Sequence, residues 1–527
     1  MPEPGPALSG DGSQGSVLAR PDRVSGIAAA LKWLLVGVSV WYIGSYLVVA
    51  LLRIGYPFEL EWMEGAVANH VLGILNGRPL YVPPSLEFVP FIYAPFYYYV
   101  SAGLAMITGF SLFPLRLVSL LSSLACLGII YAFVRRETGS RFFGLVAAAL
   151  FAATFRAAGA WLDIARADSL FLALSLAGLY LVRFSRSGLG LAAAGALFAL
   201  AFHTKQTALF IALPVMAWSL ATHRRRSLPF VVTFSALAGV AVPVLNSIYH
   251  GWYYYYVFFL PAHGTFLKSV LWEFWIKDLL WVMPVACVLA VVLLARRRTG
   301  LGRGIWSFYV PAGAGLVATA WFGRLHHGGY SNALLPAFVG LAILGVMGAS
   351  VLTRPPDSPE PKHRALATVV YLACIVQFGL LWYNPATLIP SRQDARAGRE
   401  LVATLAGFQG ELFMPHHGYL PELAGKRSCA HQMAICDVLN AGPSEVGNRL
   451  LSEIGQAIEQ HRFSAIVIDH PFLLQDVILA HYRVQSRAFS TENVFWPRTG
   501  VRTRPEFILV PRAGSQPSPA DSANSRP

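Results

Sequence analysis

The sequence predicts an α-helical protein that crosses a membrane many times and ends in a small α/β region. Three observations carry this prediction. Of the 527 residues, 55% are hydrophobic and 13% are charged, about half the ~25% of charged residues in an average soluble domain. The mean hydropathy is +0.52. Residues 1–383 hold 27 basic and 14 acidic residues, whereas residues 384–527 hold 14 and 13. These values exclude a soluble enzyme, a disordered chain and a coiled coil, and the basic surplus reports membrane topology rather than nucleic-acid binding.

Eleven apolar stretches are candidate spans, because about 20 apolar residues cross a bilayer as a helix, and two of them, 169–184 and 189–203, are short. They lie at residues 29–52, 112–134, 142–162, 169–184, 189–203, 207–221, 228–248, 279–295, 305–322, 333–353 and 365–383. Together they define a predicted transmembrane module over residues 27–383, with interfacial helices in 55–111. The Gly/Ser/Pro-rich leader 1–26 and the Pro/Ser-rich tail 513–527 are predicted to be disordered.

A twelfth apolar run, residues 88–110, is predicted to lie at the interface or to re-enter rather than to cross. If it does not cross, one side of the membrane receives 18 of the 27 basic residues, among them Arg135, Arg136 and Arg224–Arg226. If it crossed, every later cluster of basic residues would lie on the opposite side of the membrane from the N-terminal positive charges. The positive-inside rule therefore predicts eleven crossings, with the N-terminus in the cytoplasm and the C-terminus outside.

Residues 384–512 are predicted to form a small extracytoplasmic α/β domain, because polar stretches of helical and strand periodicity alternate there. Helices are expected at 392–406 and 445–460, and strands at 411–415, 465–469 and 507–510. Outside the cell Cys429 and Cys436 can form a disulfide, and two free thiols are the equal alternative. The histidines of this part are expected to be structural or solvated: His416, His417, His431 and His470.

The first predicted outer loop carries two carboxylates, Glu61 and Glu64, at the start of an amphipathic stretch. Residues three apart share one face of a helix, so both side chains are expected on the same side. Acidic residues at a helix start can simply complement the helix dipole. A functional carboxylate is the favoured interpretation, because the segment lies between a membrane span and an aromatic platform.

The second and third outer loops supply an Asp/Arg/Asp cluster and a Lys-Gln turn. Asp163 and Arg166 stand at i and i+3, so they can form a local ion pair, and Asp168 can cap the next helix. Lys205 can snorkel to the interface or contact a phosphate as a point charge, with Gln206 beside it. For both loops, a structural role and a ligand-binding role are therefore retained as alternatives.

The fifth outer turn combines Arg324, His326 and His327 with flexible glycines. Adjacent histidines are a weak metal signal, since neighbouring side chains rarely face the same way, and an anion site is at least as well supported. Taken together, the outer loops offer carboxylates that can act as a general base on a hydroxyl and cations that can hold a phosphate leaving group. This chemistry suits transfer of a group from a lipid phosphate at the membrane surface.

Four stretches resemble motifs of the GT-C superfamily of integral-membrane glycosyltransferases, which includes protein O-mannosyltransferases, aminoarabinose transferases and Rgt-type sugar transferases. They are Glu61–Gly65, Tyr93–Tyr97, Asp163–Asp168 and Thr204–Gln206, and the resemblance covers roughly residues 30–225. Two departures stand out: Met63 occupies the usual Asp position of the first motif, and Ala94 replaces a proline of the second.

The resemblance implies an inverting transferase that takes a hexose or pentose from a polyprenyl phosphate and places it on a lipid, glycan or protein hydroxyl. It implies a carboxylate base in the first loop, so Glu64, Glu61 and then Asp163 are the candidates for the catalytic base. Arg166, Asp168, Lys205, Gln206, Arg324, His326, His327 and Tyr93 are the expected substrate-binding residues. No cofactor is implied with certainty, although a divalent metal is compatible with the chemistry.

The expected location is the inner membrane, and no nucleic-acid partner is expected. Two other functions remain open. A transporter or flippase of lipid-linked substrate would place charges near the bilayer midplane and show inverted repeats, which this sequence does not display. An inactive scaffold that has kept the fold is the other alternative, because the first motif lacks its Asp.

Overall fold

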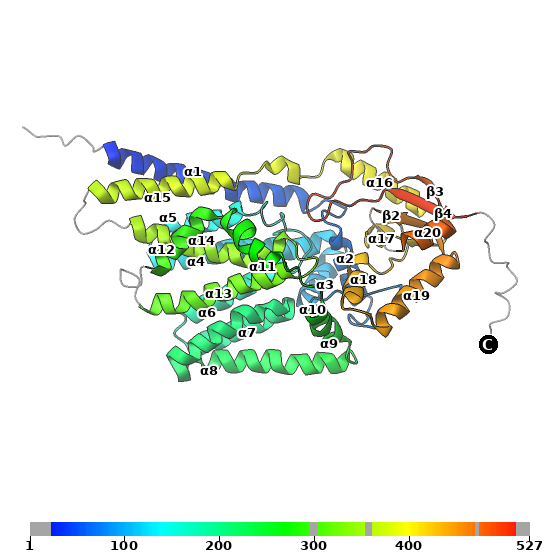
Figure 1. Ribbon diagram of the computed structural model, residues 1–527, viewed down its shortest axis with the longest axis horizontal. Coiled ribbons are helices and arrows are strands. Elements are labelled where there is room, and N and C mark those ends of the chain that lie inside the picture. Colours follow the sequence, from blue (N-terminus) through cyan, green and yellow to red (C-terminus); the bar gives the residue numbers. More distant parts are fainter. Residues whose placement is uncertain (1–22, 296–302, 354–360, 470–473, 513–527) are drawn as a thin grey trace, which may run out of the picture.

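The computed structural model describes residues 23–295, 303–353, 361–469 and 474–512 (Figure 1). Most of the leader and all of the tail that were predicted to be disordered lie outside these ranges, as do His470, Arg296–Arg298 and Arg354. The apolar helices form a bundle at the left of Figure 1, and the C-terminal sheet lies at the right.

The bundle consists of apolar helices of 12 to 40 residues. They are α1 Arg23–Arg53, α4 Leu112–Thr138, α5 Arg141–Ala153, α6 Asp168–Phe184, α7 Gly188–Thr204, α8 Leu209–Ile248, α12 Pro284–Ala295, α13 Arg303–Leu325, α14 Leu335–Thr353 and α15 Pro361–Leu380. Helix α14 is almost completely buried, and its Gly345 and Gly348 lie so close to α12 that a Cβ on either would meet the α12 backbone. Small residues thus let the central helices approach closely.

By length and hydropathy, the described residues contain five helices that could cross a membrane, or up to six if the bent pair Val270–Leu280 and Pro284–Ala295 is one span. The number of eleven crossings stays a prediction. The structure places a helical segment at each of the eleven expected positions, because α8 contains two of them, 207–221 and 228–248, on either side of non-helical backbone at His223 and Arg224.

Two of the expected spans have different limits. Helix α5 ends at Ala153, although the apolar pattern of 142–162 predicts that it continues. The following residues form buried turns with positive φ at Gly159 and Ala160, and the Ala160 carbonyl accepts a hydrogen bond from Arg53 at 2.7 Å. Turns held by a tertiary contact thus stand where the apolar pattern predicts further helix. The expected span 279–295 begins only at Pro284, after a bend of 96°.

Short helices complete the molecule, most of them between the bundle and the C-terminal sheet. They are α2 Met63–Leu75, α3 Phe96–Thr108, α9 Trp252–Tyr254, α10 Leu260–His263 and α11 Val270–Glu273. Helix α3 occupies the run 88–110, and its 13 residues reach about 20 Å, less than the ~30 Å hydrocarbon core of a bilayer. Its length suits an interfacial or re-entrant segment.

The C-terminal region, here residues 385–512 as far as they are described, contains a four-stranded sheet in the order β1-β2-β4-β3. Strands β1 and β2 are parallel, and the other pairs are antiparallel. The elements are α16 Arg392–Ala406, β1 Glu411–Phe413, α17 Leu420–Leu423, α18 Gln432–Asn440, α19 Glu445–Glu459, β2 Phe463–Ile468, α20 Gln475–His481, β3 Tyr482–Arg487 and β4 Phe507–Pro511. The amphipathic patterns predicted α16, α19 and three strands, whereas β3, α17, α18 and α20 were not expected.

The sheet is covered on both faces, and one of its cores is shared with the short helices α2 and α3. Along β2, Ala465 and Val467 pack with α16, because alternate residues of a strand face opposite sides. Phe463, Ile466 and Ile468 pack in a second core that also contains residues of α2, α3, α18 and α19. This shared core fixes the C-terminal region over the first outer loop.

The disulfide allowed for Cys429 and Cys436 is not formed, and both thiols are free. Cys436 lies within α18, and Cys429 precedes that helix with its Sγ 3.6 Å from the Leu412 carbonyl oxygen. The local helix and the strand contact therefore hold the two side chains apart.

Candidate active site

Polar side chains from the loops 54–62 and 154–167 and from the ends of α6 and α7 gather where the bundle meets the C-terminal region. Most of them are buried. Buried charges are stable only when they are paired or hydrogen-bonded, so their partners indicate which ones serve the structure and which are available for chemistry.

Glu64, the first candidate for the base, is held on both oxygens. Arg116 of α4 donates from Nε to Oε1 at 2.9 Å and from Nη2 to Oε2 at 2.6 Å. The backbone N–H groups of Ala165 and Leu60 donate to the same carboxylate, each at 2.7 Å. Burial alone would raise the pKa of Glu64, but the Arg116 guanidinium and these N–H groups hold it below its usual range. This pattern is that of a permanently ionised carboxylate that organises the loops.

Asp163 forms a second buried pair, with Arg53 at the end of α1. Arg53 donates from Nε to Oδ2 at 2.6 Å and from Nη2 to Oδ1 at 2.5 Å. The local ion pair between Asp163 and Arg166 that their spacing allows is therefore not the one formed. Arg53 and Arg116 were missed by sequence reasoning, although both stand at the predicted outer ends of spans, where the positive-inside rule does not expect arginines.

Glu61 is the carboxylate that is buried without an ionic partner. Its side chain is 0% exposed, its Oε2 accepts from the Met63 N–H at 3.2 Å, and its Oε1 has no hydrogen-bond partner among the described residues. Burial raises the pKa of Glu61 to about 8, against a smaller lowering effect of the Arg166 charge. A group with these properties can exchange a proton near neutral pH.

Arg166 is buried in an aromatic setting and has no carboxylate bonded to it among the described residues. Its Nη2 donates to the Tyr93 hydroxyl at 2.8 Å, and its Nη1 lies 3.2 Å from the Met63 sulfur. The guanidinium carbon lies 5.2 Å from the Tyr93 ring centre and 4.9 Å from that of Trp161. A guanidinium has five N–H donors, so further donors remain for a ligand.

Asp168 joins Lys205 and Asn332 at the start of α6. Its Oδ1 accepts from Lys205 Nζ at 2.7 Å and from Asn332 Nδ2 at 2.9 Å. The expectation that Asp168 caps the helix is wrong, because the helix begins at Asp168 itself and the preceding Ala167 makes no side-chain cap. Tyr93, Arg166, Asp168 and Lys205 line a cavity of 10 Å³, which is room for about one water.

The other expected binding residues have structural contacts. Gln206 donates from Nε2 to the carbonyls of Ile92 and Val257, both at 3.1 Å. Arg324 pairs with Asp278 at 2.9 Å and donates to the Gly329 carbonyl. His326 lies between the carbonyls of Phe322 and Pro261, and the His327 side chain is exposed while its N–H bonds to Thr265. None of these contacts includes Arg166 or Lys205.

A segment of the C-terminal region, residues 498–500, covers Glu61. The N–H groups of Arg498 and Thr499 donate to the Leu60 carbonyl, at 2.9 and 3.2 Å. Trp161 donates to the Thr499 hydroxyl at 2.8 Å, which ties the second loop to the same segment. At Gly500, where φ is +77°, an added Cβ would meet the Glu61 side chain, so glycine is required for this close approach.

His417 joins the first loop to the sheet. Its Nδ1 lies 2.6 Å from Glu59 Oε2, and its Nε2 lies 3.0 Å from Asp469 Oδ2. Burial alone would lower the pKa of His417, but Asp469 and Glu59 raise it to about 10, so the imidazole is positively charged at neutral pH. This histidine is structural, as expected, although no sequence signal pointed to its partners.

Among the residues that the structure describes, no group of three or more His, Cys, Asp or Glu side chains could hold a metal ion. The site offers one buried carboxylate without an ionic partner, Glu61, which feels the charge of Arg166. Arg166 in turn lines a small cavity together with Lys205, and both cations retain donors beyond their present bonds. Such an arrangement can take a proton from a hydroxyl and stabilise negative charge that develops nearby.

The model of the dolichyl-phosphate-mannose-protein mannosyltransferase family matches residues 92–250. No protein of curated function matches the chain by sequence. Among solved structures, ArnT from Cupriavidus metallidurans bound to undecaprenyl phosphate is similar, with 14% identity and a TM-score of 0.58 over 91% of this chain and 99% of that one. The same protein in the apo state has a TM-score of 0.57 at 14% identity, over 93% and 100%.

The Archaeoglobus fulgidus oligosaccharyltransferase in complex with Zn and sulfate is similar at 12% identity, with a TM-score of 0.50 over 83% of this chain and 68% of that one. At such identities the likeness shows a shared fold. The chain therefore shares the fold of ArnT, which agrees with the resemblance drawn from its motifs.

Proposed function

We propose that this chain is a membrane glycosyltransferase that moves a sugar from a polyprenyl-phosphate donor to a hydroxyl acceptor, with inversion at the anomeric carbon. The observation that carries the proposal is the placement of Glu61, a buried carboxylate without an ionic partner, within the electrostatic reach of Arg166. This pair lies where the bundle meets the C-terminal region. The similarity to ArnT, solved with undecaprenyl phosphate, supports a lipid-linked donor.

Glu61 is the proposed base. Glu64 and Asp163 are each engaged by a buried arginine through two hydrogen bonds, so neither is free to accept a proton without breaking an ion pair. Their proposed role is to hold the loops in place. Glu61 keeps an oxygen without a partner among the described residues, and its raised pKa matches the requirement for proton transfer.

In the proposed reaction, Glu61 takes the proton of the acceptor hydroxyl. The hydroxyl oxygen of the acceptor attacks the anomeric carbon from the face opposite the phosphate. The bond between that carbon and the phosphate oxygen breaks, and the electron pair leaves with the polyprenyl phosphate. Arg166 and Lys205 stabilise the extra negative charge on the phosphate, because two of the three ammonium donors of Lys205 remain beyond its bond to Asp168. Tyr93 orients Arg166.

The cavity at Arg166 is too small for a sugar phosphate, so donor binding requires movement at this site. The proposed topology is an inner-membrane protein with eleven crossings, a cytoplasmic N-terminus and the C-terminal region outside. On that topology the donor headgroup and the acceptor meet on the outer surface.

The test uses the full chain in proteoliposomes with radiolabelled undecaprenyl-phosphate-linked hexose or pentose, and envelope lipids, glycans and peptides as acceptors. Release of undecaprenyl phosphate with transfer of the label is the expected result. Arg166→Gln should abolish this transfer. Arg396→Ala, which changes a 78% exposed arginine of the C-terminal region, should leave the transfer unchanged. Movement of intact donor across the membrane without cleavage would instead identify a transporter, and neither movement nor cleavage would identify a scaffold.

A further inference from the structure

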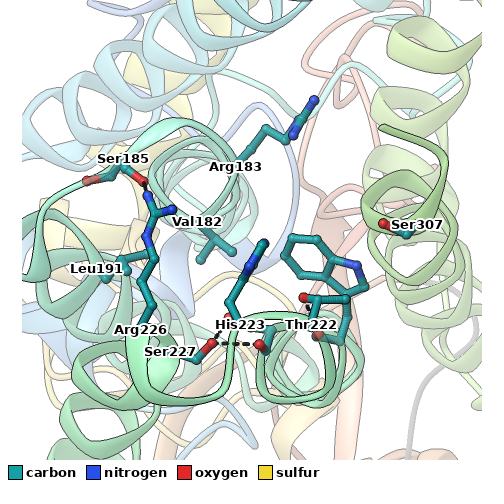
Figure 2. Close-up of a pocket in the computed structure, with 11 residues that line it drawn as sticks. Val182, Arg183, Ser185, Leu191, Thr222, His223, Arg226, Ser227 and Ser307 are labelled. Atoms are coloured by element: carbon teal, nitrogen blue, oxygen red, sulfur yellow. Dashed lines mark hydrogen bonds between the residues drawn. The ribbon is translucent and has the colours of Figure 1, made fainter. Parts of the chain in front are cut away.

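A cavity lined by bundle helices lies at the end of the bundle farthest from the C-terminal region. It has a volume of 410 Å³ and lies between the ends of α6, α7, α8 and α13 (Figure 2). Arg183 and Ser185 contribute from the end of α6, and His223 and Arg226 from the break in α8. This end is separate from Glu61 and Arg166 and is the end that we expect to face the cytoplasm.

The break in α8 builds one wall of this cavity. Backbone at His223 and Arg224 is not helical, and the chain turns back there. Ser219 and Ser227, on the two arms, form a hydrogen bond between their hydroxyls at 2.7 Å, and the Ser227 hydroxyl also bonds to the Ser219 carbonyl at 2.6 Å. These bonds hold the turn closed, so the side chains on it keep fixed positions around the cavity.

Two arginines that line the cavity differ in their hydrogen-bond partners. Arg183 is fixed by Glu137, to which its Nε donates at 2.6 Å. Arg226 donates from Nη2 to the Ser185 carbonyl at 2.8 Å and has no carboxylate partner among the residues that the structure describes. Figure 2 shows the Arg226 guanidinium beside Ser185, with His223 to its right in the view. Most of the donors of Arg226 are therefore available to an anion.

A buried donor without a partner is the second observation. Trp218 lines the cavity, and within the described ranges its indole Nε1 has no hydrogen-bond partner although it is buried. Its ring contacts those of His223 and Phe308, with centroids 5.6 and 5.1 Å away, so it cannot simply turn to water. A buried N–H is costly unless it is bonded, and an oxygen-rich ligand in the cavity would satisfy it.

We infer that this cavity binds the phosphodiester headgroup of an anionic phospholipid from the cytoplasmic leaflet. Inorganic phosphate shares the charge and the oxygen acceptors, but the surroundings favour a lipid. The arms of α8 next to the cavity expose apolar side chains outward, with Leu220 38%, Leu228 49% and Val232 59% exposed. A headgroup in the cavity would leave its acyl chains against this surface. Basic pockets between membrane helices are typical sites for such headgroups.

The chain offers a matched control, because three consecutive arginines stand at the break and only one of them lines the cavity. Arg226 lines it, whereas Arg224 and Arg225 do not. All three follow the positive-inside rule, so a general attraction to an anionic surface would not distinguish them. A specific site would depend on Arg226 and on Trp218.

The test is native mass spectrometry of the full chain released from nanodiscs of phosphatidylcholine with 20–30 mol%, roughly a physiological share, of phosphatidylglycerol. We expect phosphatidylglycerol to remain bound in preference to phosphatidylcholine. Arg226→Ala should weaken this binding about tenfold or more, as for a lost charged hydrogen bond. Trp218→Phe, which keeps an aromatic ring but removes the N–H, should weaken it less.

The double variant Arg224→Ala with Arg225→Ala should retain binding, and Arg226→Lys provides a folded variant that keeps the charge. Equal loss in the double variant and in Arg226→Ala would overturn the site in favour of a diffuse basic surface. Binding that is unchanged in Arg226→Ala would overturn it as well. Displacement of the lipid by millimolar inorganic phosphate would overturn the assignment to a lipid.

Discussion

Replacing Glu61 by Gln tests the proposed base most directly. Gln has nearly the same volume and can still accept the bond from the Met63 N–H, but it cannot take a proton. Glu61 is 0% exposed, and burial raises its pKa to about 8. A general base acts only when it is ionised, so about one Glu61 in ten is ready at pH 7 and about nine in ten at pH 9.

Loss of a general base lowers the rate by about 10²–10⁴. The parental rate should rise with pH through about 8 as Glu61 ionises, whereas the residual rate of Glu61→Gln should not follow this ionisation. The ratio of the two rates should therefore grow about tenfold between pH 7 and pH 9. The assay is release of polyprenyl phosphate from the labelled donor in proteoliposomes, with kcat and KM measured separately at each pH.

Glu64→Gln is the matched control, since it changes the neighbouring carboxylate in the same way. It should act on stability, because it leaves Arg116 buried without its charged partner, and breaking a buried pair costs about 3–5 kcal/mol. Its melting temperature should fall, while Glu61→Gln should melt near the parental temperature. If folded Glu61→Gln transfers sugar at the parental rate from pH 7 to pH 9, Glu61 is not the base.

Three other predictions concern the phosphate, the C-terminal region and the topology. Lys205→Met should lower turnover about tenfold or more, since a charged hydrogen bond contributes roughly 1.5–3 kcal/mol, and unchanged kinetics would leave Lys205 as a partner of Asp168 alone. The pKa of His417 is raised to about 10, so its charge stabilises the fold below about pH 6.5 and this contribution is lost as pH rises through about 10. Thermal unfolding of His417→Gln should therefore depend less on pH over that window, and a profile parallel to the parental one would contradict the linkage. A reporter fused after Asn384 that is active only in the cytoplasm should be silent, and a strong signal would refute the proposed topology.

The sequence predicted the parts of the fold that depend on local pattern. The apolar runs marked the helices of the bundle, and the amphipathic period placed α16 at Arg392–Ala406. Such patterns fail where a distant residue decides the outcome. Helix α5 ends at Ala153, and the turns that follow it place the Ala160 carbonyl against Arg53, a contact that no property of the run 142–162 reveals.

The candidate site also combines features that local sequence predicts with contacts to distant residues that it does not predict. The loops that carry Glu61, Arg166 and Lys205 were singled out from their residue types and their expected side of the membrane. Which carboxylate is paired could not be derived, because the partners of Glu64 and Asp163 stand 52 and 110 residues away. Sequence spacing favoured the nearer Arg166 as the partner of Asp163, whereas two arginines in the span ends have the geometry for bidentate pairs.

The covering segment 498–500 has a consequence for the synthesis of the protein. A chain is synthesised from its N-terminus. Leu60 therefore leaves the ribosome long before Arg498 and Thr499, whose N–H groups donate to the Leu60 carbonyl. A chain that ends before this segment can already contain the ion pairs Arg53–Asp163 and Arg116–Glu64. It would leave Glu61 exposed to water, without the burial that raises its pKa. The buried environment of Glu61 is therefore completed only when nearly the whole chain has been made, so we expect a truncated product to retain the helices and to lack the base that we propose.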